Sequence, residues 1–548
     1  MPPVGACASG GRGAREGVVV ESGRLVRNCE SPSNVKAALR KESELKEPLP
    51  KRAVSLGSSL LVLLALGASV ALLLISFPQS RCSRGAAWFS LVPWLLLILR
   101  TTPRRALLYS WIFGSIFFFI GIRWMRFVTI PGWVLLSLYL AAYFALFGFL
   151  YRLMGCWGLL SGPFLWVGLE LARARLLTGF PWFSLGYSQA TILPVIQVAD
   201  FGSFYAVSFV VVLVNLALVE IVLAVSHPSK AAFRRAALAT AAATVLVLGS
   251  LAYGWWRLGT VRAEQGPSVA VVQGNIPQSV KESYGTAYEV LIDHIALSDL
   301  IPEGSVDMIL WPETMVLVPL NVSEDYLEIL AGLAREKAAH LLVGAHSAIG
   351  GKYFNSAYLF SDEGALLDRY DKLHLVPFGE YVPLSRFLSF ISKIVPYEEG
   401  LSPGVAPVLF SIGPYRFSVL ICYEDTIPEL VRAVAPPNPG FLVNITNDGW
   451  FRGSAELEQH LEISSFRAIE TRTGLVRAAN TGISAIISPT GKIEEPLTGE
   501  GGLSKEVEGV LTGHVAVGGG PVDAGQFRVN DRRVQVLLQA MPLRGSMG

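Results

Sequence analysis

The stretch FSVLICYEDTIPEL, residues 417–430, joins a buried strand to a group of reactive side chains. Its first part, FSVLIC, is a short apolar run of the kind that forms a strand inside a sheet. The run ends on Cys422, and three carboxylates follow closely, at Glu424, Asp425 and Glu429. A cysteine that only packs a core has no need of such neighbours, whereas a nucleophilic thiol needs polar groups that help it to lose its proton. The segment therefore predicts a sheet-containing domain with a candidate nucleophile at a strand end.

Short apolar runs recur on both sides of this segment, across residues 265–515. They alternate with segments 324–338 and 456–473, in which apolar residues have the spacing of amphipathic helices. This pattern predicts one globular α/β domain. The predicted strands are 268–273, 306–311, 340–345, 417–422, 441–446, 475–480 and 483–488.

The chain before this domain is strongly apolar. Of the 548 residues, 52% are hydrophobic and only 16% are charged, and the mean hydropathy is +0.47. Such a composition indicates membrane spans, because about 17–25 apolar residues cross a bilayer as a helix. We therefore predict a polytopic α-helical membrane bundle of about seven spans over residues 53–257. The candidate spans are 53–77, 86–99, 106–122, 127–151, 153–169, 202–226 and 236–256.

The two ends of the chain are polar. Residues 1–52 lack the apolar core of a cleavable signal peptide, and we interpret them as a disordered cytoplasmic extension. Residues 516–548 contain no clear transmembrane helix. Lys and Arg are almost equally divided between the two sets of loops, although the clusters at 100–105 and 230–235 favour a cytoplasmic N-terminus. With seven spans, the domain after residue 257 then lies outside.

Charge, cysteine and histidine usage exclude several classes of protein. The net charge of +2 predicts no general affinity for nucleic acid. The cysteines show no CxxC pair or disulfide-rich spacing, and the seven histidines form no HExxH pattern, so we predict no metal and no cofactor. The five cysteines are Cys7, Cys29, Cys82, Cys156 and Cys422.

Two further segments place polar groups beside predicted strands. LWPET, residues 310–314, ends a strand near Glu313, and YDKLHLVPFGEYVP, residues 370–383, contains Lys372 and Glu380. A cysteine nucleophile needs a base for its proton and a positive group or N–H donors for the oxyanion of acyl transfer. A carboxylate and a lysine can supply both roles without histidine. Taken singly, each residue could be an ordinary core cysteine, strand-exit glutamate or loop lysine, and it is their combination that favours catalysis.

These motifs, in this order, resemble the nitrilase or carbon–nitrogen hydrolase superfamily. The sequence motifs are most similar to those of its membrane branch, the apolipoprotein N-acyltransferases, over roughly residues 100–515. The resemblance also rests on VVQGNIPQSVK (271–281), NSAYLF (355–360), NITNDGWF (444–451), QHLEISSFRAIETRTGLVRAANTGISAIISPTG (459–491), TGFPWFSLGYSQA (178–190) and VADFGSFYAVSFVVVLVNLALVE (198–220).

The resemblance implies a fold and a set of site residues. The fold is a nitrilase-like α-β-β-α sandwich carried by the membrane bundle. Glu313 matches the general base of the family, Lys372 its lysine and Cys422 its nucleophile. By analogy, Glu424 orients Lys372 or its loop rather than acting as the base. The positions that match supporting or substrate-binding residues are Glu380, Tyr423, Glu424 and Trp450.

The resemblance also implies an activity and a location. The enzyme would take an acyl chain from a phospholipid, usually phosphatidylethanolamine, as a thioester on its cysteine. It would pass that chain to the α-amino group of the N-terminal diacylglyceryl-cysteine of an apolipoprotein. We expect a monomer, multi-pass in the bacterial inner membrane, with its catalytic domain in the periplasm. The family usually has a last transmembrane helix after this domain and has no counterpart of residues 1–52.

Two other functions compete with this interpretation. A membrane-tethered amidase would have the same triad but release its acyl group to water. A transporter with an accessory domain would need ionisable residues inside the spans, where the acidic residues are Glu170 and Glu220, both near helix ends. Certain aromatic residues would either line a dry entrance to the site or simply pack: Trp182, Phe183, Phe378, Trp450 and Phe451.

Overall fold

The structure is a computed structural model. It describes residues 56–78, 84–155, 158–281, 286–377, 379–381, 400–438, 440–499 and 502–518. The predicted N-terminal extension, the C-terminal tail from residue 519, Phe378 and the cysteines other than Cys422 lie outside these residues.

The N-terminal half is helical, and each of the seven predicted spans overlaps one helix. Of the described helices, α5, α8 and α9 are long and apolar enough to cross a membrane, so the number of seven spans stays a prediction. The helices are α2 (Leu56–Ile75), α3 (Val92–Leu99), α4 (Pro103–Gly121), α5 (Ile130–Met154), α6 (Gly158–Arg173), α7 (Leu193–Ile196), α8 (Ala199–Ser226) and α9 (Lys230–Thr260), with short turns η1 (Arg84–Trp88), η2 (Arg123–Phe127), η4 (Leu176–Thr178) and η5 (Leu185–Gln189).

The outer surface of these helices is apolar. Large side chains such as Leu61, Leu135, Phe164 and Val245 are more than half exposed. In water such a surface would be strongly unfavourable, whereas in a bilayer it contacts lipid. Helix α9 shows the pattern most clearly, because its buried face against α8 consists largely of small residues, a common way for membrane helices to pack closely. The chain is a membrane protein.

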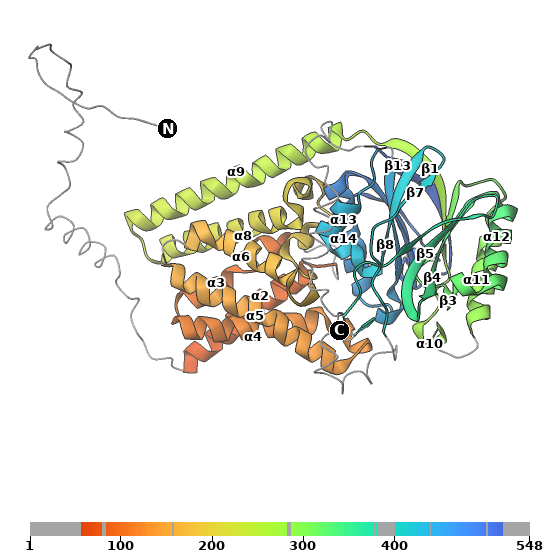
Figure 1. Cartoon of the computed structure of the whole chain (residues 1–548). Coiled ribbons are helices and arrows are strands. Elements are labelled where there is room, and N and C mark those ends of the chain that lie inside the picture. Colours follow the sequence, from red (N-terminus) through yellow and green to blue (C-terminus); the bar gives the residue numbers. More distant parts are fainter. Residues whose placement is uncertain are drawn as a thin grey trace, which may run out of the picture. The chain divides into compact units, whose positions relative to one another are not determined.

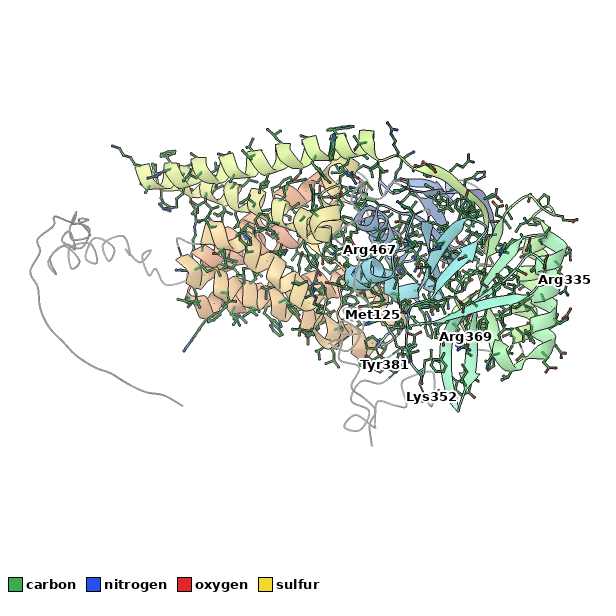
Figure 2. The ribbon with its side chains drawn as sticks, turned by 45° about the horizontal axis from the view of Figure 1, so that its top comes forward. Met125, Arg335, Lys352, Arg369, Tyr381 and Arg467 are labelled. Carbon is green, nitrogen blue, oxygen red and sulfur yellow. The ribbon has the colours of Figure 1, made fainter. Side chains whose placement is uncertain are left out.

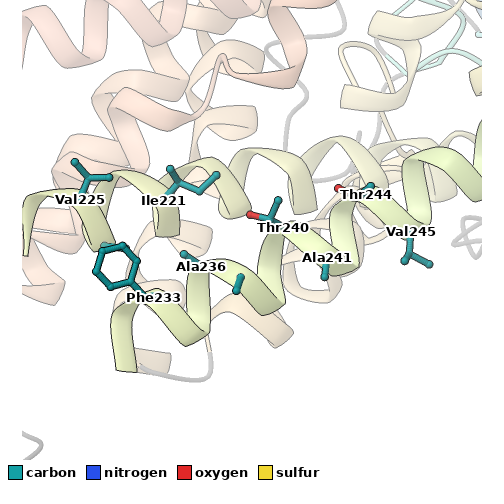
Figure 3. Close-up of a pocket in the computed structure, with 10 residues that line it drawn as sticks. Ile221, Val225, Phe233, Ala236, Thr240, Ala241, Thr244 and Val245 are labelled. Carbon is teal, nitrogen blue, oxygen red and sulfur yellow. The ribbon is translucent and has the colours of Figure 1, made fainter. Parts of the chain in front are cut away.

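An open groove lies between α8 and α9 (Figure 3). Its volume is about 690 Å³, and its lining is apolar apart from Thr240 and Thr244. It belongs to the outward surface of the helical part and contains none of the predicted site residues. We therefore interpret it as part of the lipid-facing surface.

The C-terminal half contains two sheets. In the first, the strand order is β13-β1-β2-β4-β5-β6, with β3 paired to β4; in the second it is β12-β11-β10-β9-β8-β7. Every predicted strand corresponds to one of these strands. The strands are β1 (Glu264–Gln273), β2 (Met308–Leu310), β3 (Val316–Pro319), β4 (His340–Ile349), β5 (Lys352–Phe360), β6 (Leu366–Asp371), β7 (Leu409–Ile412), β8 (Tyr415–Ile421), β9 (Gly440–Asn447), β10 (Gly474–Asn480), β11 (Ala485–Ile487), β12 (Ile493–Pro496) and β13 (Gly509–Val517).

Helices cover both outer faces of the two sheets. Successive residues of a strand point to opposite faces, so Val269 and Val271 of β1 join the core between the sheets while Ala270 and Val272 pack under helices. Figure 1 shows α11 and α12 on one side and α13 and α14 on the other. The layers form the predicted α-β-β-α sandwich. The helices are α10 (Gln278–Lys281), α11 (Ala287–Asp299), α12 (Glu324–Lys337), α13 (Pro428–Val434) and α14 (Glu456–Thr471), with turns η6 (Leu320–Val322), η8 (Cys422–Thr426) and η9 (Asp448–Phe451).

Helix α14 lies between the second sheet and the membrane helices. The sequence predicts an amphipathic helix here, yet nearly all of its residues are buried, because its polar side chains contact the helical bundle. Arg84 of η1 pairs with Glu462, and Ser203 of α8 donates to Glu470 at 2.5 Å. Figure 2 labels Arg467 of α14 at this junction. The domain that contains the two sheets is thus joined to the bundle by buried polar contacts.

Candidate active site

The three predicted catalytic residues follow three different strands. Glu313 comes after β2, Lys372 directly after β6, and Cys422 directly after β8. The first two strands belong to one sheet and the third to the other. Because the two sheets pack face to face, their strand ends bring the three residues to one place in the domain.

Lys372 lies between two carboxylates. Its Nζ donates to Oε1 of Glu380 at 2.9 Å and to Oε1 of Glu313 at 3.3 Å, and its side chain is only 1% exposed. Asn355 Nδ2 donates to both of the same oxygens, at 3.0 and 2.7 Å. The second oxygen of Glu313 accepts from the backbone N–H of Asn447 at 2.9 Å. These hydrogen bonds hold both carboxylates in fixed positions around the ammonium group.

The charges of this cluster set the protonation of its members. Burial lowers the pKa of Lys372, but the carboxylates of Glu380 and then Glu313 outweigh it and raise that pKa above its ordinary value. Burial, followed by the charge of Glu313, raises the pKa of the Cys422 thiol well above its ordinary value, and Lys372 acts in the opposite direction. At neutral pH the site therefore holds a charged lysine and a protonated thiol beside a carboxylate that can accept its proton.

The backbone places Cys422 just outside its strand. The sequence predicts a strand through Cys422, but β8 ends at Ile421 because the φ angle of Cys422 is +52° and breaks the ladder. Such an angle is uncommon in a residue other than glycine and is typical of functional sites held by their surroundings. Asn444 Nδ2 donates to the carbonyl oxygen of Cys422 at 3.2 Å, and the cysteine is partly exposed. The turn thus presents a thiol at the edge of a buried cluster.

Glu424 connects the nucleophile turn to the loop after Lys372. It is fully buried and accepts from the backbone N–H groups of Leu373, His374 and Ile421 at 2.7, 3.0 and 2.8 Å. Its carboxylate also accepts from the hydroxyl of Tyr370 at 2.9 Å. Burial raises the pKa of Glu424 to about 7, against the effect of these donors and of the Lys372 charge.

Tyr423 links the same turn to the helical bundle. Its hydroxyl donates to the carbonyl of Gly179 at 2.6 Å, and its ring stacks on Trp182 with the centroids 5.6 Å apart. Phe183 instead packs against Phe77 and Phe117 inside the bundle. Of the five aromatic residues considered for an entrance, Trp182 therefore lies beside the site, and Phe183 is a packing residue.

Two further aromatic candidates, Trp450 and Phe451, lie in turn η9, which follows β9. Trp450 is partly exposed there. The ring of Phe451 meets the ring of Trp124 from turn η2 edge to face, at 4.8 Å between centroids. The indole of Trp124 in turn lies 6.0 Å from that of Trp182. A row of rings therefore runs from the junction with the bundle to Tyr423.

A buried ionic network under the site was not predicted from the sequence. His460 contacts Asp425 through Nε2 at 2.9 Å and Asp448 through Nδ1 at 3.1 Å. Arg477 donates to Asp448 at 2.7 Å and to the Oδ1 of Asn444 at 2.6 Å. Although burial and Arg477 oppose it, the two aspartates raise the pKa of His460 to about 10. The network ties turn η8, which carries Cys422, to turn η9.

The missed residues left a signal in the sequence. Asn355 opens the quoted NSAYLF segment, Asn447 and Asp448 belong to NITNDGWF, and His460 and Arg477 belong to the long segment 459–491. Asn and Asp inside apolar strand runs require buried hydrogen-bond partners. Their position could therefore have been inferred, but their partners could not.

A cation does not fit this network well. Asp448, Glu456 and His460 bring possible ligand atoms within 4.8 Å of one another. However, both oxygens of Asp448 already contact positive groups, Arg477 and His460. A metal ion would add charge beside Arg477, so we assign no metal to this group.

Comparisons with known proteins agree with this architecture. The family described as apolipoprotein N-acyltransferase N-terminal domain matches residues 69–217, and carbon-nitrogen hydrolase matches residues 268–518. The apolipoprotein N-acyltransferase of Geobacter metallireducens is 38% identical over 80% of this chain and 87% of its own length. That of Allorhizobium ampelinum is 31% identical over 77% of this chain and 83% of its own length. Among solved structures, an amidase from Nesterenkonia sp. is 20% identical, with a TM-score of 0.36, over 51% of this chain and 98% of that chain. The match covers most of this chain and most of each apolipoprotein N-acyltransferase named above, and it shows that the chain belongs to the apolipoprotein N-acyltransferase family.

Proposed function

We propose that this enzyme transfers an acyl chain from a membrane phospholipid to the α-amino group of the N-terminal diacylglyceryl-cysteine of apolipoproteins. The chain passes through a thioester on Cys422. The observation that carries the proposal is the buried contact between the Lys372 ammonium group and the Glu313 carboxylate beside a partly exposed thiol. Membership of the family supplies the two substrates, because its members named above are apolipoprotein N-acyltransferases.

The first half-reaction forms the thioester. The thiol of Cys422 gives its proton to Glu313 while its sulfur attacks the carbonyl carbon of the donor ester. The ammonium group of Lys372 stabilises the oxyanion that develops. When this intermediate collapses, the bond between the carbonyl carbon and the glycerol oxygen breaks. Glu313 returns the proton to that oxygen, and a lysophospholipid leaves.

The second half-reaction uses the same groups. The free amine of the apolipoprotein attacks the thioester carbonyl, and Glu313 takes a proton from the amine nitrogen. The carbon–sulfur bond then breaks, an amide remains on the acceptor, and the cysteine sulfur recovers the proton. Water must be kept from the thioester between the two steps, since its attack would make the enzyme a hydrolase. The rings of Trp182 and Tyr423 beside the turn support such a dry site.

The supporting residues have different roles in this proposal. Glu380 shares the ammonium group of Lys372 with Glu313, and Glu424 holds the loop that carries the lysine. Tyr423 joins the nucleophile turn to the bundle. We assign Trp450, which is partly exposed in turn η9, to contact with an acyl chain.

The location follows from the two lipid substrates. We place the enzyme in the bacterial inner membrane as a multi-pass monomer with its catalytic domain in the periplasm, and phosphatidylethanolamine as its usual donor. Confinement of enzyme and substrates to one plane raises their effective concentration. A reporter that is active only in the cytoplasm, fused after Val517, should therefore give no signal. Strong cytoplasmic activity would reverse this orientation.

The activity is tested with purified full-length enzyme and phosphatidylethanolamine in the absence of apolipoprotein. We expect a burst of about one lysophospholipid per enzyme and a thioester on Cys422 that neutral hydroxylamine cleaves. A peptide with an N-terminal diacylglyceryl-cysteine should then discharge the adduct as an amide. Cys422→Ala should give neither adduct nor burst, and Glu313→Gln should form the adduct very slowly.

Two outcomes would contradict the proposal. Continuous release of free fatty acid without the peptide would indicate the tethered hydrolase instead. An acyl group on another residue, or full activity of Cys422→Ala, would refute the thioester mechanism itself.

A further inference from the structure

Two arginines from different halves of the chain share one aromatic ring. Arg126 belongs to turn η2, between membrane helices α4 and α5, and Arg452 follows turn η9 of the catalytic domain. Their guanidinium carbons lie 5.0 and 4.9 Å from the centroid of the Phe127 ring, so they are within about 10 Å of each other. Both arginines are exposed.

Neither arginine has a carboxylate partner in the described part of the chain. No ion pair of these residues involves Arg126 or Arg452, whereas three other arginines do pair with carboxylates between the two halves of the chain. Two like charges held close together on one ring repel each other and raise the local positive potential. An anion bound between the two guanidinium groups would relieve this repulsion.

The backbone at Arg452 supports a role for its side chain. Its φ and ψ angles are +52° and −165°, a region that is occupied almost only by glycine. A glycine would remove this strain at no steric cost. The chain instead places a long cationic side chain there and directs it to Phe127. Strain of this kind is typical of functional positions.

The arginines lie at an apolar surface of the helical part, and a series of ring contacts connects them to the candidate site. Turn η2 follows a helix with exposed apolar residues, and Val128 and Ile130 just after it are exposed as well. Trp124 of the same turn contacts Phe451, the residue before Arg452, and belongs to the row of rings that leads to Tyr423. Figure 2 labels the neighbouring Met125 at the junction of the helical part and the sheets.

We propose that Arg126 and Arg452 bind the phosphate of the donor phospholipid and so position its ester for attack by Cys422. The inference rests on the proposed function. Guanidinium groups match phosphate oxygens in a bidentate arrangement, and stacking on Phe127 orders them before the lipid arrives. A phospholipid at the membrane surface presents its phosphate a few bonds from the ester carbonyl. The interfacial position of η2 therefore selects a lipid phosphate over a soluble one.

The test compares a donor that has a phosphate with one that has none. Arg126→Gln, Arg452→Gln and the double variant are assayed with phosphatidylethanolamine in mixed micelles and with a p-nitrophenyl ester of a fatty acid. Loss of one charge-assisted contact should raise the KM for the phospholipid about tenfold, and the double variant more, with little change in kcat. The KM for the neutral ester should stay within about twofold of the wild-type value.

Three controls separate binding from structure. Arg123→Gln removes an exposed charge from the same turn without touching the Phe127 pair, and should leave both KM values unchanged. Arg126→Lys keeps the charge but loses the planar fork, and should recover only part of the affinity. Arg452→Gly relieves the backbone strain, so it should keep or raise the melting temperature while still raising the KM for phospholipid.

Several results would overturn the proposal. An unchanged KM for phosphatidylethanolamine would do so, as would an equal rise with both donors, which would mean a structural role. Variants that lose binding to phosphatidylglycerol vesicles but keep their KM would assign the arginines to the membrane surface instead. If the wild-type enzyme forms a thioester from neither donor, the proposed function itself fails, and this outcome is distinct from the others.

Discussion

Replacing Glu424 by Gln should loosen the loop that carries Lys372 while leaving the three catalytic groups themselves intact. The carboxylate accepts from Leu373 and His374 through one oxygen and from Ile421 through the other. An amide has only one accepting oxygen. In either orientation of the amide, its NH₂ group faces at least one buried backbone N–H. The hydroxyl of Tyr370 can rotate to accept a hydrogen bond instead of donating one, but the backbone N–H groups cannot.

The cost can be estimated from these contacts. The loss of one charge-assisted hydrogen bond lowers stability, because its donor stays buried without a partner. Removal of the buried charge, which burial disfavours, partly offsets this loss. We therefore expect the free energy of unfolding to fall by about 1–3 kcal/mol. Catalysis should suffer more, because a displacement of about 1 Å in a positioned group can cost about 10²-fold in rate.

The assay measures the single-turnover rate of acylation at Cys422 together with the melting temperature in detergent. Glu328→Gln is the matched control, since that residue is 76% exposed and pairs only with Arg335 at the surface. It should change neither quantity measurably. If Glu424→Gln acylates at the wild-type rate and melts at the wild-type temperature, the view that this residue holds the Lys372 loop is refuted.

Three other changes should have measurable results. Lys372→Arg should lose about 10²–10³-fold in rate, nearly as much as Lys372→Ala, because the planar guanidinium group does not fit the space of an ammonium group. Near-normal turnover of Lys372→Arg would show that the lysine is only a surface charge. The His460 pKa of about 10 exceeds the ordinary value of 6.5, so its contribution to stability is complete below pH 6.5 and is lost as the pH rises through about 10. The melting temperature of the wild-type enzyme should fall over that interval. If the melting temperature of His460→Gln depends on pH in the same way, this assignment is contradicted. Tyr423→Phe keeps the stack on Trp182 but leaves the Gly179 carbonyl without its donor, and should lower the unfolding free energy by about 1–2 kcal/mol; an equal melting temperature would count against that contact.

The central strands could be predicted from the sequence because they are buried on both faces and read as continuous apolar runs. Strand β9 and strand β10 are examples, with every residue buried. The strands that were missed include the sheet edges β6, β7, β12 and β13. An edge strand carries exposed polar residues, as β6 does at Asp368, so its apolar run is interrupted and resembles a loop.

Two catalytic candidates, Glu313 and Cys422, could be predicted because each follows an apolar strand, and Lys372 could be predicted because it lies in the recognisable segment 370–383. The groups that orient them could not, since these contacts depend on which strand ends meet. Asn355 lies 42 residues from Glu313 and Asn447 lies 134 residues from it, yet both hydrogen-bond to that carboxylate. A side chain that acts by holding another has no chemical signature of its own in the sequence.

Helix α14 shows why composition alone misjudged one face of the catalytic domain. Its glutamates and arginines suggest a helix with a solvated side, but Glu462 and Glu470 are buried against the membrane helices and contact Arg84 and Ser203. Breaking a buried ion pair by removing one partner costs about 3–5 kcal/mol. A domain that detached from the bundle would leave the buried Glu462 without its partner Arg84. This helix is therefore suited to an enzyme that is joined to the bundle. The same polar residues that predict a solvated helix therefore argue that the nitrilase-like domain works against the membrane helices, where we propose that its lipid substrates bind.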